Sequence, residues 1–157
     1  PIWREVAVDL RFDWPAALTA AGFDRGAPTA WLAEGLLMYL PADAQDRLLE
    51  NVTELSAVGS RIALETAPTR AEDRRAAMRE RFARVAEHFQ LEHTLDVGGL
   101  FYNDANRANP AEWLERAGWT VEAQSAADEM RRLDRWLDIP GADDPDAWSS
   151  FVVAGRG

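Results

Sequence analysis

The sequence contains no cysteine, no lysine and only two histidines among its 157 residues. Without cysteine it can form neither a disulfide nor a thiolate metal site. The two histidines, His88 and His93, are five residues apart, a spacing that places them on different faces of a helix. We therefore expect no metal centre. All 17 basic residues are arginine, which indicates a bias of coding composition rather than a functional choice.

The chain also lacks a long apolar run and an excess of positive charge. None of its apolar stretches approaches the roughly 18 residues that span a bilayer. Its 27 acidic and 17 basic residues give a net charge of −10, and such a surface repels nucleic acid and anionic lipid. The absence of cysteine removes one sign of secretion. We expect a cytoplasmic protein that binds neither nucleic acid nor a membrane.

A starting methionine is absent as well. The chain begins at Pro1 and enters a strand-like segment almost at once. Its length is that of about one domain. A domain seldom starts so abruptly, so we expect a piece of a longer protein in which residues 1–157 form part of one domain.

What is present is an alternation of strand and helix patterns. Short apolar stretches predict strands, and apolar residues recurring every three or four positions predict helices. The first part predicts a strand over 4–10, a helix over 13–22, a strand over 28–40 buried on both faces, a helix over 41–57 and a strand over 60–67. This order, with short connections, is typical of a doubly wound α/β sheet.

The alternation breaks after residue 67. The remaining sequence predicts a long charged helix over 69–90, a loop-rich stretch over 91–109, a helix over 110–119, a strand over 120–125, a helix over 126–137 and a final strand over 148–157. We divide the chain accordingly into a core (1–67), a helical and loop cap (68–109) and C-terminal helices and last strands (110–157).

Three acidic residues stand near the ends of predicted strands: Asp9, Glu34 and Glu65. In open α/β sheets, ligands bind beyond the carboxyl ends of the strands. Carboxylates accept hydrogen bonds from an amino group or from ribose hydroxyls, and they attract a nearby cation. Several carboxylates facing one crevice would suit a ligand that is both a nucleoside and positively charged, such as S-adenosylmethionine.

Glu34 is the one charge in the apolar segment WLAEGLLMYL, residues 31–40. A buried carboxylate without a partner is costly or has a raised pKa. Two interpretations follow. Either Glu34 pairs inside the fold with a buried arginine such as Arg61, or it reaches a cleft where a ligand supplies the partner.

Four segments, in this order, carry a resemblance to a known family: VDLRFDWPAALTAAGFD (8–24), PTAWLAEGLLMYLPADAQDRLLENV (28–52), GSRIALETAP (59–68) and NPAEWLERAGW (109–119). They resemble the leucine carboxyl methyltransferase family, and more closely its bacterial branch of S-adenosylmethionine-dependent methyltransferases. The resemblance implies an α/β fold with a Rossmann-like methyltransferase sheet, helices on both faces and a last strand antiparallel to the others. This chain would hold the C-terminal half only.

The resemblance also implies roles for particular residues. Asp9 and Leu10 would lie against the adenine of S-adenosylmethionine, and Glu34 would border the same cofactor. Tyr39 stands where the family has a tyrosine near the substrate pocket, and it either lines that pocket or packs beneath the next helix. Apart from the resemblance, Tyr102, in the stretch GGLFYNDANR (98–107), either helps to cap the pocket and bind substrate or belongs to a structural loop. No catalytic residue and no metal ligand is implied.

One part of the family pattern is missing. In the family, the glycine-rich cofactor loop and the acidic residue that holds the ribose precede the segments found here. The stretch DVGGL (96–100) follows no clear strand and opens no helix, so it is no substitute. The implied partners are the N-terminal half of the same protein and a small-molecule or carboxylate-bearing substrate. Arg107 either pairs with an anionic substrate or lies at the surface.

The implied function is S-adenosylmethionine-dependent O-methylation of a carboxylate or a hydroxyl by in-line methyl transfer, with this chain inactive in isolation. The alternative is a non-catalytic half-domain that folds or functions only with a partner chain. A nicotinamide-dependent oxidoreductase is a third interpretation, but the sequence holds no glycine fingerprint and no obvious catalytic residue for it.

Overall fold

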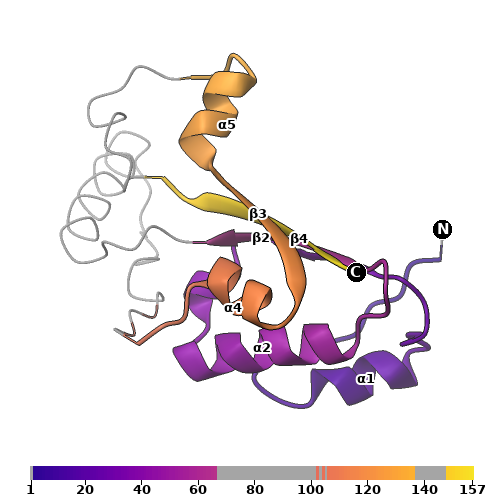
Figure 1. Ribbon diagram of the computed structural model, residues 1–157. Coiled ribbons are helices and arrows are strands. Elements are labelled where there is room, and N and C mark those ends of the chain that lie inside the picture. Colours follow the sequence, from indigo (N-terminus) through magenta and orange to yellow (C-terminus); the bar gives the residue numbers. More distant parts are fainter. Residues whose placement is uncertain (1, 67–101, 103, 105, 137–147) are drawn as a thin grey trace, which may run out of the picture.

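The computed structural model describes residues 2–66, 102, 104, 106–136 and 148–157. Its elements, shown in Figure 1, are α1 (Trp14–Ala20), β1 (Ala30–Ala33), the 3-10 helix η1 (Leu37–Tyr39), α2 (Ala42–Glu54), β2 (Arg61–Thr66), α4 (Pro110–Arg116), β3 (Trp119–Ser125), α5 (Ala126–Arg132) and β4 (Ser150–Arg156). The predictions for the charged helix over 69–90, for DVGGL and for the two histidines lie outside the described residues.

The four strands form one sheet in the order β1-β2-β4-β3. β1 and β2 are parallel, with Ala33 opposite Leu64, whereas β4 is antiparallel to both β2 and β3. β1, β2 and β3 therefore run the same way, and β4 runs against them between β2 and β3 (Figure 1). The predicted α/β sheet with an antiparallel last strand is confirmed.

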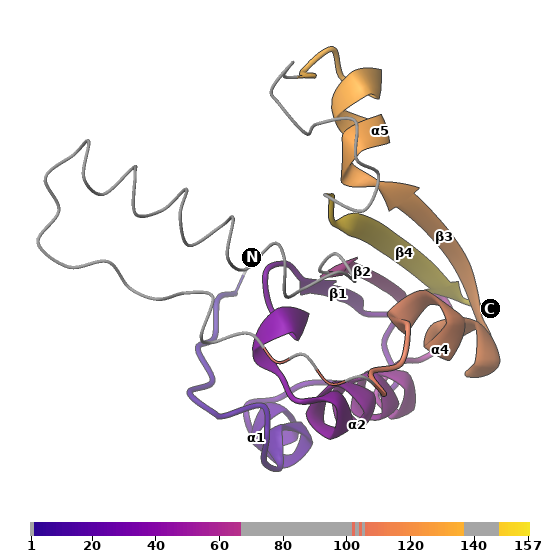
Figure 2. The ribbon, with the colours of Figure 1, turned by 90° about the vertical axis from the view of Figure 1, so that its left-hand side faces the viewer.

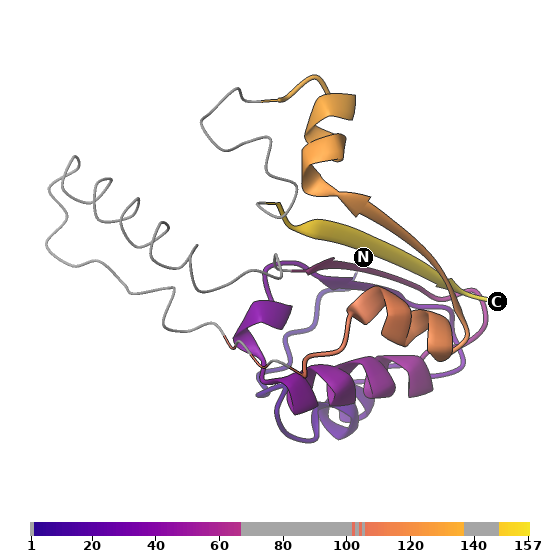
Figure 3. The same ribbon diagram turned by 60° about the vertical axis from the view of Figure 1, so that its left-hand side comes forward.

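Helices α1, α2 and α4 lie on one face of this sheet (Figures 2 and 3). The core between the helices and the sheet is apolar, and its most buried members include Leu49, Leu55, Leu114 and Val152. The predicted apolar side of α2 is confirmed, because its leucines and valine face this core. Removing such side chains from water is the main force that holds the layers together.

The opposite face of the sheet is exposed in the described part of the chain. Leu32 of β1 is 69% exposed and Val153 of β4 is 44% exposed. Leu32 lies opposite Ala63 of β2, which lies opposite Val153, so the three form one apolar row. α5 projects from the end of β3, away from the three-helix layer (Figure 3). A helix layer over the second face is not among the described residues, so that part of the fold prediction stays a prediction.

Capping side chains set the starts of three helices, α1, α4 and α5, the last of them through Ser125. Asp13 accepts a hydrogen bond from the Ala16 N–H at 3.2 Å at the start of α1, and Asn109 accepts one from the Ala111 N–H at 2.9 Å at the start of α4. Such an acceptor satisfies an N–H that has no partner within the helix. The predicted end of α1 at Gly22 is confirmed, since this residue has a φ of +92°.

Residues 4–10, predicted as a strand, form no strand in the structure, so this prediction is wrong. A strand needs a neighbour that satisfies its backbone hydrogen bonds, and no described strand pairs with this segment. Instead, the Arg4 guanidinium donates to the carbonyl of Ala21 and covers Gly22 so closely that a Cβ there would clash with it. The segment is thus tied to the C-terminal end of α1.

The predicted strand over 28–40 is shorter than expected and is not buried on both faces. Only Ala30–Ala33 is strand, and it lies at the edge of the sheet. The chain then turns at Gly35, whose φ is +58°, and continues in η1; Leu37 in η1 and Leu40 just after it are buried. The apolar residues of this segment are buried through a turn and a 3-10 helix rather than through a strand covered on both sides.

No helix in the described ranges is long and apolar enough to cross a membrane. The same residues contain no group of three or more aspartate, glutamate or histidine side chains that could hold a metal ion. The division of the chain at residues 67 and 109 stays a prediction, because most of the proposed cap lies outside the described part.

Candidate functional site

Glu34 and Glu65 stand side by side at the carboxyl ends of β1 and β2. The pairing of Ala33 with Leu64 places Glu34, the residue after β1, next to Glu65. Glu65 Oε2 accepts a hydrogen bond from the Gly35 N–H at 3.2 Å, so Glu65 holds the turn that follows Glu34. Gly35 takes a left-handed conformation that favours glycine, and the space into which a Cβ would project is open. Two carboxylates thus meet at the edge where α/β sheets bind ligands.

The Glu34 side chain is exposed rather than buried, and no ion pair among the described residues involves it. The buried pair with Arg61, considered from the sequence, is wrong. Arg61 is itself exposed and lies opposite Ala30 at the start of β1, roughly 13 Å along the strand from Glu34. The carboxylate of Glu34 is therefore accessible from solvent at the end of the strand.

Asp9 is held in a tight turn by Arg11. The Phe12 N–H donates to the carbonyl of Asp9 at 3.0 Å, and Leu10 between them packs against the core. The Arg11 side chain donates to both carboxylate oxygens of Asp9, from Nε at 3.0 and 3.1 Å and from Nη2 at 2.6 Å. These side-chain bonds are the largest cause of the lowered pKa of Asp9, which is about 2. A hydrogen bond from the Arg11 backbone N–H to the same carboxylate is the second cause. The carboxylate is therefore ionised at neutral pH.

Tyr102 lies beside the turn that carries Tyr39. Its backbone N–H donates to the carbonyl of Met38 at 3.0 Å, so the two tyrosines stand on adjacent backbone segments. Tyr39 is 38% exposed and Tyr102 is 44% exposed. The structure thus brings the segments that carry the two tyrosines together.

The two parts of the candidate site are not directly joined. In the described part of the chain, no hydrogen bond or ion pair links Asp9 to Glu34. Glu65 was noted from the sequence only as an acid at a strand end, and its bond to Gly35 gives it a supporting place next to Glu34.

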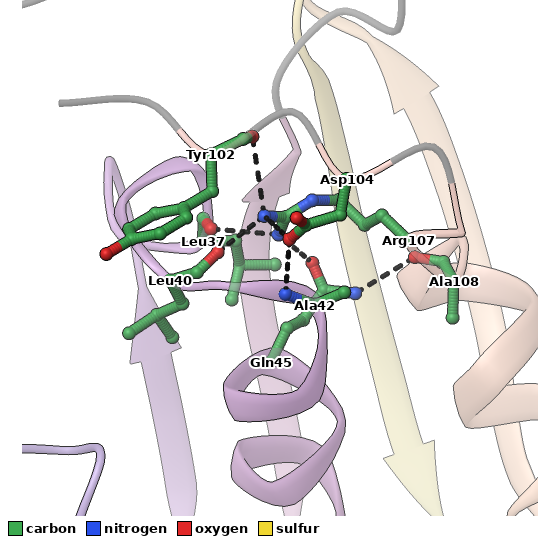
Figure 4. A network of polar contacts seen from close by, with 8 residues as sticks. All are labelled: Leu37, Leu40, Ala42, Gln45, Tyr102, Asp104, Arg107 and Ala108. Carbon is green, nitrogen blue, oxygen red and sulfur yellow. Dashed lines mark hydrogen bonds and ion pairs between the residues drawn. The ribbon is translucent and has the colours of Figure 1, made fainter. Parts of the chain in front are cut away.

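Arg107 is half-buried rather than a surface side chain, so that sequence-based interpretation is wrong. Pairing with an anionic substrate is not tested, but the guanidinium is already bonded within the fold. Figure 4 shows its guanidinium against η1 and the start of α2, where it donates to the carbonyl oxygens of Leu37 (3.1 Å), Leu40 and Tyr102 (3.4 Å). Nη1 also donates to Gln45 Oε1 at 2.8 Å. Only 21% of the Arg107 side chain is exposed.

Two residues that the sequence did not reveal complete this network. Asp104 Oδ2 accepts from the Ala42 N–H at 2.6 Å and lies 3.7 Å from Arg107 Nη2. Gln45, 1% exposed, donates to the carbonyl of Ala108 at 2.9 Å. These partners are 62 and 63 residues apart in the sequence, beyond the reach of a local pattern. The one available signal was a glutamine on the apolar face of α2.

Residues 2–53 match the model of the leucine carboxyl methyltransferase family. Among solved structures, the chain is similar to a DUF574 family protein from Streptomyces avermitilis MA-4680, with 14% sequence identity and a TM-score of 0.54 over 96% of this chain and 53% of that chain. At this identity the likeness shows the fold alone.

The chain is also similar to magnesium protoporphyrin IX methyltransferase (ChlM) from Synechocystis PCC 6803, solved with bound SAH, with 11% identity and a TM-score of 0.43 over 92% of this chain and 57% of that chain. A likeness at that score supports no argument. The chain spans about half the length of both solved proteins. The resemblance seen in the sequence, to the leucine carboxyl methyltransferase family, is confirmed over residues 2–53.

Proposed function

We propose that this chain is the C-terminal half of an S-adenosylmethionine-dependent methyltransferase and supplies the adenine side of its cofactor site. The observation that carries the proposal is the family match over residues 2–53, a range that holds Asp9, Leu10, Glu34 and Tyr39. This chain covers only 53% of the similar DUF574 family protein, which supports the further proposal that the glycine-rich half belongs to the same protein.

The residues at the carboxyl edge of the sheet fit this cofactor. The ionised carboxylate of Asp9 can accept a hydrogen bond from an adenine amino group with the lone pairs that Arg11 leaves open. Leu10 can offer an apolar contact to the ring. Glu34 is exposed beside the open space at Gly35, so its charge can attract a cationic or hydroxyl-bearing part of a ligand.

The proposed reaction is O-methylation of a carboxylate or a hydroxyl. S-adenosylmethionine supplies a methyl carbon on a sulfonium, which an acceptor displaces in line. The protein's task is then to align the acceptor and exclude water. A carboxylate acceptor is already a nucleophile, whereas a hydroxyl needs a general base. Tyr39 and Tyr102, exposed on adjacent segments, can orient an acceptor oxygen through their hydroxyls.

A thermal-shift comparison tests this function on the complete protein, meaning this chain together with the half proposed to precede it. S-adenosylhomocysteine is expected to raise the melting temperature, and NAD is expected to leave it unchanged. Glu34→Ala should reduce the shift given by S-adenosylhomocysteine, while Glu50→Ala, on the exposed side of α2, should keep it. A shift with NAD alone would favour the oxidoreductase, and equal shifts for both variants would remove Glu34 from the site.

A second candidate function is a half-domain that works only with a partner chain. It is supported by the position of β1 at the edge of the sheet and by the exposed apolar row of Leu32, Ala63 and Val153. Unpaired strand edges and apolar faces associate with other chains. Sedimentation of the chain alone separates the candidates: self-association or aggregation favours the half-domain, and a soluble monomer argues against it.

A further inference from the structure

The Arg107 network joins two segments that each carry an exposed tyrosine. The first segment is η1 with the start of α2 and includes Tyr39, and the second includes Tyr102 and residues 106–109. Figure 4 shows the guanidinium of Arg107 where the two segments meet, with the ring of Tyr102 extending away from it. The ring of Tyr102 therefore points away from the polar side chains that join the two segments.

The guanidinium contacts both segments at once. It donates to Leu37 and Leu40 of the first segment and to the carbonyl of Tyr102 in the second. A guanidinium holds its donors in a rigid plane, so bonds to several fixed carbonyl oxygens determine how the two backbones lie relative to each other. A lysine has a compact ammonium on a flexible stem and cannot reproduce that arrangement.

A second link fixes the same two segments. Pro41, the N-cap residue of α2, makes no side-chain capping bond. Asp104, from the second segment, accepts a hydrogen bond from the Ala42 N–H at the first turn, where the helix dipole favours a negative charge. Gln45 is almost fully buried and accepts from Arg107 while donating to Ala108. The separation of Tyr39 and Tyr102 is therefore determined by buried and half-buried polar side chains, although both tyrosines are exposed.

We propose that Arg107 is a positioning residue that sets the spacing of Tyr39 and Tyr102 and thereby selects the methyl acceptor. The inference rests on the proposed function, in which the acceptor binds beside the two tyrosines. Arg107 acts through backbone carbonyls and touches neither cofactor nor acceptor.

The positioning role is tested by amide hydrogen exchange in Arg107→Lys, Arg107→Met and the control Arg47→Met, whose arginine pairs with Asp43 on the exposed side of α2. Both Arg107 variants should speed exchange at the Tyr102 amide at least tenfold and leave the amides of β2 and β4 within twofold of the wild type. The control should change neither. Unchanged exchange at Tyr102, or an equal rise throughout the chain, would overturn the positioning role. Arg107→Lys keeps the positive charge, so its exchange rate at the Tyr102 amide tests the positioning role even if Arg107→Met fails to fold.

Acceptor selection is tested on the complete protein with S-adenosylmethionine carrying a tritiated methyl group and a panel of carboxylic acids and phenols. For an acceptor that the wild type methylates, Arg107→Lys should raise the KM at least tenfold and keep the affinity for S-adenosylhomocysteine within twofold. A loss confined to cofactor affinity would overturn the selection role. Absence of methylation by the wild type would overturn the proposed function and acceptor selection together, whereas the exchange result would still decide whether Arg107 holds Tyr102.

Discussion

At the scale of single residues, Asp9 is a partly exposed carboxylate whose orientation and charge are set by one neighbouring arginine. Arg11 donates to both of its oxygens, and the turn of the backbone adds an N–H. The pair lowers the pKa of Asp9 from 3.8 to about 2, which leaves the carboxylate ionised at neutral pH. Arg11 therefore supports the site without itself carrying any family role inferred from the sequence.

Arg11→Met should move the titration of Asp9 upward. In the wild type the Asp9 pKa is lowered from 3.8 to about 2, so the favourable pairing is fully present above pH 3.8 and is lost as the pH falls through about 2. Without the guanidinium, the midpoint should return towards 3.8. The carbon-13 shift of the Asp9 carboxyl measures this, with Arg47→Met as the control. An unchanged midpoint in Arg11→Met would contradict the assigned cause of the shift.

Predictions from the sequence succeeded for contacts between residues close in the sequence and failed for contacts between distant ones. The start of the helix predicted over 13–22 was placed correctly, and the hydrogen bond of its cap, Asp13, spans only three residues. Arg107 was misjudged because its carbonyl partners Leu37 and Leu40 lie 70 and 67 residues away. Glu34 was expected in a buried strand, but the apolar residues after it are buried through a 3-10 helix, which leaves its carboxylate exposed.

At the scale of elements, the sequence predicted helix α2 and its buried side most clearly. Its apolar residues recur every three or four positions, and the structure buries that side against the sheet. The segment over 4–10 shows the opposite case. Its β-prone residues favour a strand, but strand formation depends on a neighbouring strand, which a local pattern does not reveal.

Leu49→Ala should destabilise the described core strongly. The Leu49 side chain is 1% exposed, and its truncation leaves a cavity beneath the sheet, so the free energy of unfolding should fall by about 3 kcal/mol. Val58→Ala is the matched control, because Val58 is 72% exposed and should change stability by less than about 0.5 kcal/mol. Urea unfolding followed by tryptophan fluorescence measures both. Similar values for the two variants would contradict the packing described for α2.

At the scale of the whole molecule, helices α1, α2 and α4 cover one face of the sheet, and Leu32, Val153 and the edge of β1 are exposed. The sequence predicted the direction of the strands through its family resemblance, and the pairing of β4 confirms it. Neither sequence nor structure places a glycine-rich cofactor loop in the described residues. The proposed account therefore assigns this chain the adenine side and the acceptor side of a site that another half completes.

The most direct test of this account is calorimetric titration of S-adenosylhomocysteine into the complete protein, comparing the wild type, Asp9→Ala and Asp43→Ala. Both aspartates are exposed and paired with an arginine, but only Asp9 lies in the proposed site. The account predicts binding by the wild type, affinity weakened at least about tenfold by Asp9→Ala, and affinity within twofold of the wild type for Asp43→Ala. Equal affinity in the wild type and Asp9→Ala, or no binding by the wild type, would contradict it.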